Sequence, residues 1–108
     1  MTQSEFVSNL DLVVEKKSFD YSVDDYNAGY QCATECSNGV IENYKNLFLE
    51  QTNNIIDCTD YIEDCIGNII WILKETLEDK TEKNDFNIAY TKKINETIEK
   101  LQTILKDI

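Results

Sequence analysis

Apolar residues recur at helical spacing through almost all of this 108-residue chain. In the first of four such segments they follow the i, i+4, i+7, i+8 pattern of one helix face, and they are Phe6, Val7, Leu10, Val13 and Val14. Thr2 and Glu5 have the spacing of a capping box just before this stripe. We therefore expect a first helix over about residues 3–17, ended by the polar residues 16–18.

The second segment predicts one long helix over about residues 23–51, with Ser22 as its N-cap. Its apolar stripe consists of Tyr26, Tyr30, Ala33, Val40, Tyr44 and Leu47, with Val23, Ile41 and Phe48 beside it. Gly39 follows an asparagine, a combination that commonly ends a helix. The stripe keeps its phase across Gly39, however, so we expect a continuous helix, and a break at this glycine is the alternative.

Two further helices are expected, over about residues 55–79 and 85–107, the second with Asn84 or Thr81 as its N-cap. The third helix carries the stripe Ile55, Ile62, Ile66, Ile69, Leu73 and Leu77, and the fourth carries Phe86, Tyr90, Ile94, Ile98, Leu101, Ile104, Leu105 and Ile108. No stretch alternates with the period of a strand. Because short connections make neighbouring helices antiparallel, the chain is expected to be an all-α, single-domain, up-down bundle (residues 1–108) of three long helices and a shorter N-terminal one.

The charged residues exclude several classes of function. Aspartate and glutamate number 21 against 10 basic residues, all of them lysine, and histidine is absent, so the net charge is −11. Without histidine the chain has no imidazole to act as a general base, and without arginine it has no guanidinium group to bind phosphate through two hydrogen bonds. A nucleic-acid duplex would repel so acidic a chain. We therefore expect a binding protein that is not an enzyme, uses no cofactor and does not bind nucleic acid directly.

The acidity is concentrated in the first three helices. Residues 1–79 hold sixteen acids and four lysines, whereas residues 80–108 hold five acids and six lysines. A nearly neutral fourth helix would suit self-association, so a homodimer through this helix is one alternative. No apolar run reaches the ~18 residues of a membrane span, and the N-terminal residues do not resemble a signal peptide. A cytoplasmic location without membrane contact is expected.

Four cysteines lie on the second and third helices and are weak candidates for a metal site: Cys32, Cys36, Cys58 and Cys65. Cys58 and Cys65 would be about 10 Å apart along a helix axis, too far for thiolates that share one zinc ion. Disulfides between the two helices would be out of register by roughly two turns. We expect thiols at the edge of the apolar face, with disulfide and metal chemistry as alternatives.

The third helix also predicts a candidate binding surface opposite its isoleucine stripe. It consists of Asp57, Asp60, Asp64, Trp71, Glu75 and Glu78, and we call these six residues the acidic face. Trp71 is the only tryptophan in the chain, and aromatic anchors supply much of the free energy of protein–protein binding. Two alternatives would cover Trp71, either with the first helix or with a second copy of the protein.

In charge and compactness the chain is similar to the small acidic inhibitors encoded by phages and mobile elements, including anti-defence DNA mimics. That resemblance is one of class. It implies a protein-binding module that blocks a basic, nucleic-acid-handling surface of a partner by charge mimicry. The alternatives from other classes are a self-associating structural bundle and, less favoured, a metal or thiol protein that uses its cysteines.

Overall fold

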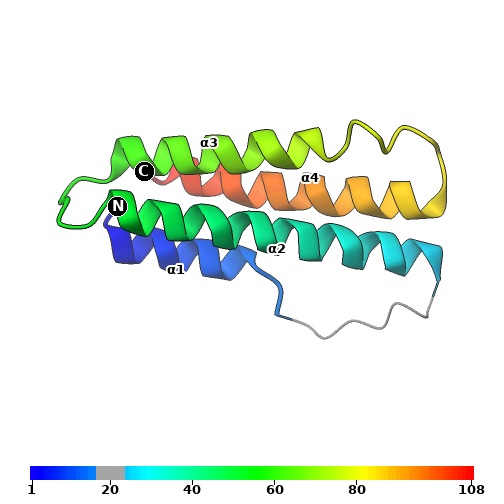
Figure 1. The fold of residues 1–108 in the computed structure, drawn as a ribbon, viewed down its shortest axis with the longest axis horizontal. Helices are drawn as coiled ribbons and strands as arrows, with labels where there is room; N and C mark the ends of the chain where they lie inside the picture. Colours follow the sequence, from blue (N-terminus) through cyan, green and yellow to red (C-terminus); the bar gives the residue numbers. More distant parts are fainter. Residues whose placement is uncertain (17–23) are drawn as a thin grey trace.

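The computed structural model describes residues 1–16 and 24–108, and within them the chain is all-α, as the periodicity predicted. It forms the helices α1 (Gln3–Val13), α2 (Asp25–Gln51), α3 (Thr59–Glu75) and α4 (Asp85–Lys106). Successive helices alternate in direction along the longest axis of a molecule that measures 46 × 26 × 21 Å (Figure 1). None of these helices has an apolar stretch long enough to cross a bilayer.

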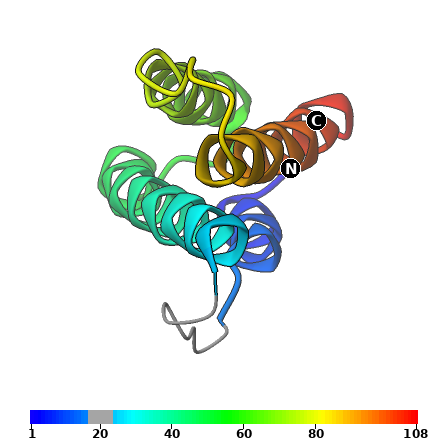
Figure 2. The ribbon, with the colours of Figure 1, turned by 90° about the vertical axis from the view of Figure 1, so that its right-hand side faces the viewer.

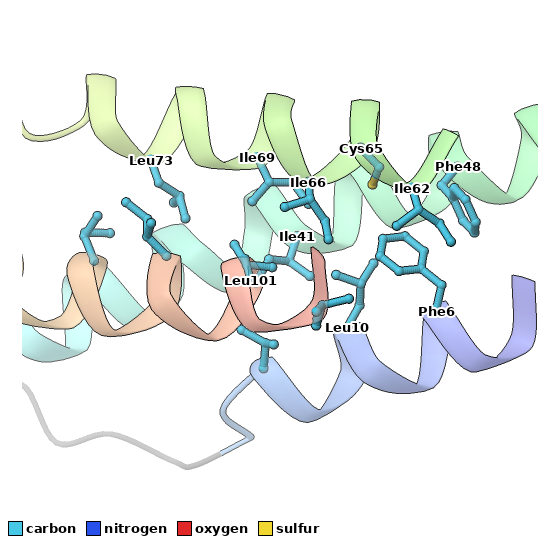
Figure 3. Close-up of a cluster of buried hydrophobic side chains, with 14 of the residues drawn as sticks. Phe6, Leu10, Ile41, Phe48, Ile62, Cys65, Ile66, Ile69, Leu73 and Leu101 are labelled. Carbon is cyan, nitrogen blue, oxygen red and sulfur yellow. The ribbon is translucent and has the colours of Figure 1, made fainter. Parts of the chain in front are cut away.

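One hydrophobic core receives side chains from all four helices (Figure 3). Its fully buried members include Phe6, Leu10, Ile41, Phe48, Ile62, Ile66, Ile69, Leu73, Ile94 and Leu101. The rings of Phe6 and Phe48 meet edge to face, with centroids 4.6 Å apart, and so join α1 to α2. Helix α4 packs against each of the other three helices.

Helix α2 is continuous through Gly39, so the predicted single helix is confirmed and the break is excluded. Its N-cap is Asp24, whose carboxylate accepts a hydrogen bond from the Asn27 N–H at 2.7 Å. The predicted cap, Ser22, lies outside the described residues. The buried face also differs from the expected stripe. Tyr26 and Leu47 are exposed, and the core side includes Gly29, Ala33, Thr34 and Ser37.

Small residues face the core because α2 and α4 approach closely at one end of the bundle. A Cβ atom added to Gly29 would lie 2.1 Å from the carbonyl oxygen of Phe86. Only glycine therefore fits at this crossing. A hydrophobicity pattern does not reveal such a face, since small and polar side chains replace the large apolar ones it looks for.

Helix α1 ends at Val13, four residues before the end expected from its sequence. The capping box of Thr2 and Glu5 is present as predicted. At the other end the Glu15 N–H donates to Asn38 Oδ1 at 3.3 Å, and Asn38 Nδ2 donates to the Glu15 carbonyl at 2.8 Å. An α2 side chain thus bonds the backbone of Glu15, and Val14 is extended.

Helix α3 is shorter than expected at both ends, spanning Thr59–Glu75 rather than 55–79. The connection from α2 turns at Asn54, whose φ of 67° lies in the left-handed region that asparagine adopts more readily than most residues. At the C-terminal end Thr76 Oγ1 donates to the Leu73 carbonyl at 2.7 Å. The following N–H groups of Leu77 and Glu78 make tighter i→i−3 bonds, so the α-helical bonding stops.

Helix α4 agrees closely with its expected bounds. It begins after Asn84, whose side chain accepts a hydrogen bond from the Asn87 N–H at 2.8 Å, and it ends at Lys106. Its apolar stripe is turned inward along most of its length, with Tyr90, Ile94, Ile98 and Leu101 all buried.

Candidate functional site

All six residues of the acidic face are exposed. Asp60, Asp64, Trp71 and Glu75 lie on α3 itself, and the Trp71 side chain is 61% exposed. Helix α1 packs against α2 and α4, so the alternative that it covers Trp71 is wrong. Trp71 is thus left largely open to water, with carboxylates exposed on the same helix.

Asp57 lies before the first residue of α3, so helical phase does not fix the direction of its side chain. Its carboxylate accepts hydrogen bonds from the Thr59 hydroxyl at 2.7 Å and from the Thr59 N–H at 3.1 Å. These two bonds, the hydroxyl first, lower the pKa of Asp57. An aspartate that bonds the N–H two residues ahead forms an Asx-turn, which explains why the helix starts later than periodicity suggested.

Glu78 likewise lies beyond α3, in the turns that follow Glu75. The acidic face therefore consists of a helical centre, made of Asp60, Asp64, Trp71 and Glu75, with one further carboxylate beyond each end of the helix.

The exposed side of α3 also contains residues that the sequence did not single out. Glu63 adds a carboxylate, Lys74 adds one positive charge, and Gly67 and Asn68 are exposed one turn before Trp71. A helical side chain leans toward the turn that precedes it, and an added Cβ on Gly67 would contact nothing within 4 Å. The surface beside the indole is therefore open rather than filled.

A groove runs between α2 and α3 beside the acidic face. It contains one pocket of about 350 Å³, lined by Tyr44, Leu47, Gln51, Tyr61, Asp64 and Asn68 among others. A second pocket of about 370 Å³ is lined by Asn43, Tyr44, Leu47 and Ile72. Because both pockets share Tyr44 and Leu47, they adjoin. Sequence reasoning missed this groove, since Tyr44 and Leu47 were assigned to the core and only the tertiary arrangement leaves them partly open.

The four cysteines are free thiols in two different environments. Cys58 and Cys65 are buried, and burial raises the pKa of Cys65 to about 12. Cys36 is half-buried and Cys32 is exposed, so the expectation of a core-edge thiol is wrong for Cys32. The disulfide alternative is not observed. Within the described ranges, no three or more cysteine, aspartate or glutamate side chains are grouped so as to hold a metal ion.

Most of the apolar stripe on which the alternative of a homodimer through α4 was based is buried within the chain. Tyr90, Ile94 and Leu101 are buried against the other helices, whereas Phe86 at one end of the stripe and Leu105 and Ile108 at the other are half-buried. The stripe that suggested self-association therefore closes the core of the monomer.

Comparisons with family models, with curated proteins and with solved structures gave no match to this chain.

Proposed function

We propose that this protein is a small acidic protein-binding module of the inhibitor type. It docks its acidic face on a basic, nucleic-acid-handling surface of a partner protein and blocks that surface by charge mimicry. In this role the chain needs no cofactor and catalyses no reaction.

The exposure of Trp71 among carboxylates carries this proposal. Burying an exposed aromatic ring at an interface contributes favourable free energy, and tryptophan is among the residues most enriched at binding hot spots. Asp60, Asp64 and Glu75 are exposed on the same helix as Trp71 and are spread along its length. Complementary charge speeds association with a basic partner and disfavours acidic ones, so the anchor and the charges would act on the same partner.

A rigid frame supports the mimicry. We take the four helices as an antiparallel up-down bundle whose packed core holds the α3 carboxylates at fixed spacing, as phosphates are held along a nucleic-acid strand. The four free thiols favour a reducing compartment, and we place the activity in the cytoplasm.

The experiment compares two triple variants as bait in affinity capture from cognate cell lysate at low and high salt. One is D60N/D64N/E75Q on the acidic face; the other is E82Q/E99Q/D107N, which changes the net charge equally at exposed sites on or next to α4. We expect wild type and the α4 variant to retain a basic protein at low salt and release it at high salt, because salt screens exposed charges. The acidic-face variant should no longer retain that basic protein at low salt.

Two further readouts test the mechanism. Adding the wild-type protein should displace a nucleic-acid probe from the captured partner in a mobility-shift assay. Trp71→Ala should weaken partner capture about tenfold or more while helical circular dichroism stays unchanged, since the indole is largely exposed. Equal capture by both triple variants, or a captured protein with no nucleic-acid affinity, would reject the proposed function.

A further inference from the structure

The groove between α2 and α3 is a position in the bundle that no helix of the described residues fills. On the other side of α2, helix α1 lies against both α2 and α4 (Figure 2). Helix α1 inserts Phe6, Leu10 and Val13 there. Helix α1 therefore covers one side of α2, whereas no helix of the described residues covers the α2–α3 groove on its other side.

The uncovered groove has the chemical character of a helix-binding site. Its walls combine apolar and aromatic side chains with polar ones. Leu47 is 43% exposed, Tyr44, Tyr61 and Ile72 are half-buried, and the polar side chains of Gln51, Asp64 and Asn68 line the same groove. Asp64 lines the groove on its α3 side. On the α2 side the lining polar residues are uncharged, namely Asn43 and Gln51.

We propose that this groove binds a short amphipathic helix of the partner protein, with lysine or arginine along the edge that faces α3; this inference rests on the proposed function. A helix suits the groove because α2 and α3 use their backbone groups within themselves and offer no free strand edge for an extended peptide. From Tyr61 to Ile72 the α3 wall extends roughly 16 Å, the length of about three helical turns. Helix α1, with 11 residues, has a similar length.

Charge selects a basic helix over a second copy of this chain. Asp64 lines the groove, and Asp60 and Glu75 lie on the same exposed side of α3. A second copy would bring its own net charge of −11 against these carboxylates, and like charges across an interface are unfavourable. Lysine or arginine side chains on one edge of the bound helix would neutralise Asp64 while its apolar face covers Leu47 and Ile72.

The test is a selection of random 16-residue displayed peptides against the wild-type protein. Expected binders carry apolar residues at i, i+3 or i+4, and i+7, together with lysine or arginine on an adjacent face. Selected peptides are then titrated in solution while the emission of Trp71, the only tryptophan in the protein, is recorded. Peptides without tryptophan are used, and binding beside the indole should shift its emission to the blue.

Matched variants distinguish the groove from the acidic face. Leu47→Ser should weaken peptide binding about tenfold, whereas Leu49→Ser should leave it unchanged, because Leu49 is an exposed α2 residue that lines neither pocket. Asp64→Asn should weaken binding and reduce its salt dependence, whereas Glu99→Gln on α4 should not.

Each of the other possible outcomes contradicts the proposal that this groove binds a basic helix. If the selected peptides are basic but lack helical spacing, and if their binding is lost in Asp64→Asn but unchanged in Leu47→Ser, the helix-binding groove is rejected and the proposed function still stands. Acidic or uncharged peptides in the groove would reject the basic occupant. Enrichment of no peptide would reject a helix-binding groove, and the lysate experiment would then decide the proposed function on its own.

Discussion

Gly29 and Gly39 lie on the same helix in opposite surroundings. A side chain at Gly29 would collide with the backbone of Phe86, whereas one at Gly39 would contact nothing within 4 Å. Neither glycine has a positive φ. The difference between them is therefore the space that the neighbouring helix leaves, rather than backbone strain.

Gly29→Ala should lower the free energy of unfolding by about 1–3 kcal/mol, because α2 and α4 must separate to admit a methyl group. Gly39→Ala should raise it by about 0.5–1 kcal/mol, since alanine loses less conformational entropy in a helix. Urea denaturation followed by circular dichroism measures both. A stabilised Gly29→Ala variant would contradict the close approach of the two helices.

The thiols should differ in reactivity with their surroundings. Burial raises the pKa of Cys65 to about 12, and burial together with the neighbouring Cys36 raises that of the exposed Cys32. A raised pKa leaves less of the nucleophilic thiolate at a given pH.

With iodoacetamide near pH 8, Cys32 should be alkylated first, more slowly than a free cysteine, and the rate should rise with pH. Cys65 should react only after denaturant is added. Mass spectrometry of timed digests follows each site. Equal alkylation rates for Cys65 and Cys32 in the native protein would contradict the burial of Cys65.

At the scale of elements, one polar network fastens the end of α1 to the bundle. Lys93 on α4, with its side chain only 3% exposed, donates to Glu15 Oε1 at 2.6 Å. The Tyr30 hydroxyl donates to the same oxygen at 3.4 Å, and Lys93 Nζ lies 5.2 Å from the centre of the Tyr30 ring. The carboxylate of Glu15 is thus bound from both α4 and α2, and its backbone is bound by Asn38 of α2.

Glu15→Gln should lower the free energy of unfolding by about 1–3 kcal/mol, because it weakens the hydrogen bonding of a buried ammonium group whose countercharge it removes. Asp11→Asn is the matched control. It weakens the ion pair with Lys45, where the Asp11 side chain is 45% exposed, and such exposed pairs contribute about 0–1 kcal/mol. Thermal denaturation compares the two variants. If Asp11→Asn were the more damaging change, the Lys93 network would not be what anchors α1.

At the scale of the whole molecule, charge opposes folding. A net charge of −11 is confined to a body 26 × 21 Å across its shorter axes. In 10 mM salt the Debye length is ~30 Å, so carboxylates repel one another across the full width of the protein, whereas at 150 mM it is ~8 Å and only near neighbours interact.

Raising NaCl from 10 to 150 mM should therefore raise the melting temperature by several degrees. The D60N/D64N/E75Q variant, with three fewer negative charges, should show a smaller rise. Calorimetry at pH 7 measures the change, and choline chloride at equal ionic strength serves as a control for specific sodium binding. A melting temperature that falls with salt would mean that attractive pairs outweigh the repulsion.

Acid acts on the same molecule in two opposite ways. Hydrogen bonds lower the pKa values of Glu5, Asp57 and Asp79 in the folded state. Their contribution to stability is complete above their unfolded pKa values, near 4, and is lost as the pH falls through the lower folded values. Protonation of the other carboxylates meanwhile relieves repulsion. Near the isoelectric point of about 4.2 the charge that keeps the molecules apart vanishes, so association should increase there.

Periodicity along the chain was sufficient for the number and type of helices, for the continuity of α2 through Gly39 and for the Asn84 cap of α4, because each depends on residues within a few turns of one another. The exposed acids and Trp71 on α3 could be found in the same way, since the isoleucine stripe marks the opposite side of that helix.

Other features depended on contacts between distant residues. Asn38 ends α1 through the backbone of Glu15, Phe86 requires glycine at position 29, and α1 lies against α2 and α4, leaving Trp71 exposed and the α2–α3 groove uncovered. The sequence by itself determined which residues make helices and which side of each is apolar. Only the tertiary structure decided which apolar sides meet, because helix packing depends on the space between helices, and that space is set by side chains far apart in the chain.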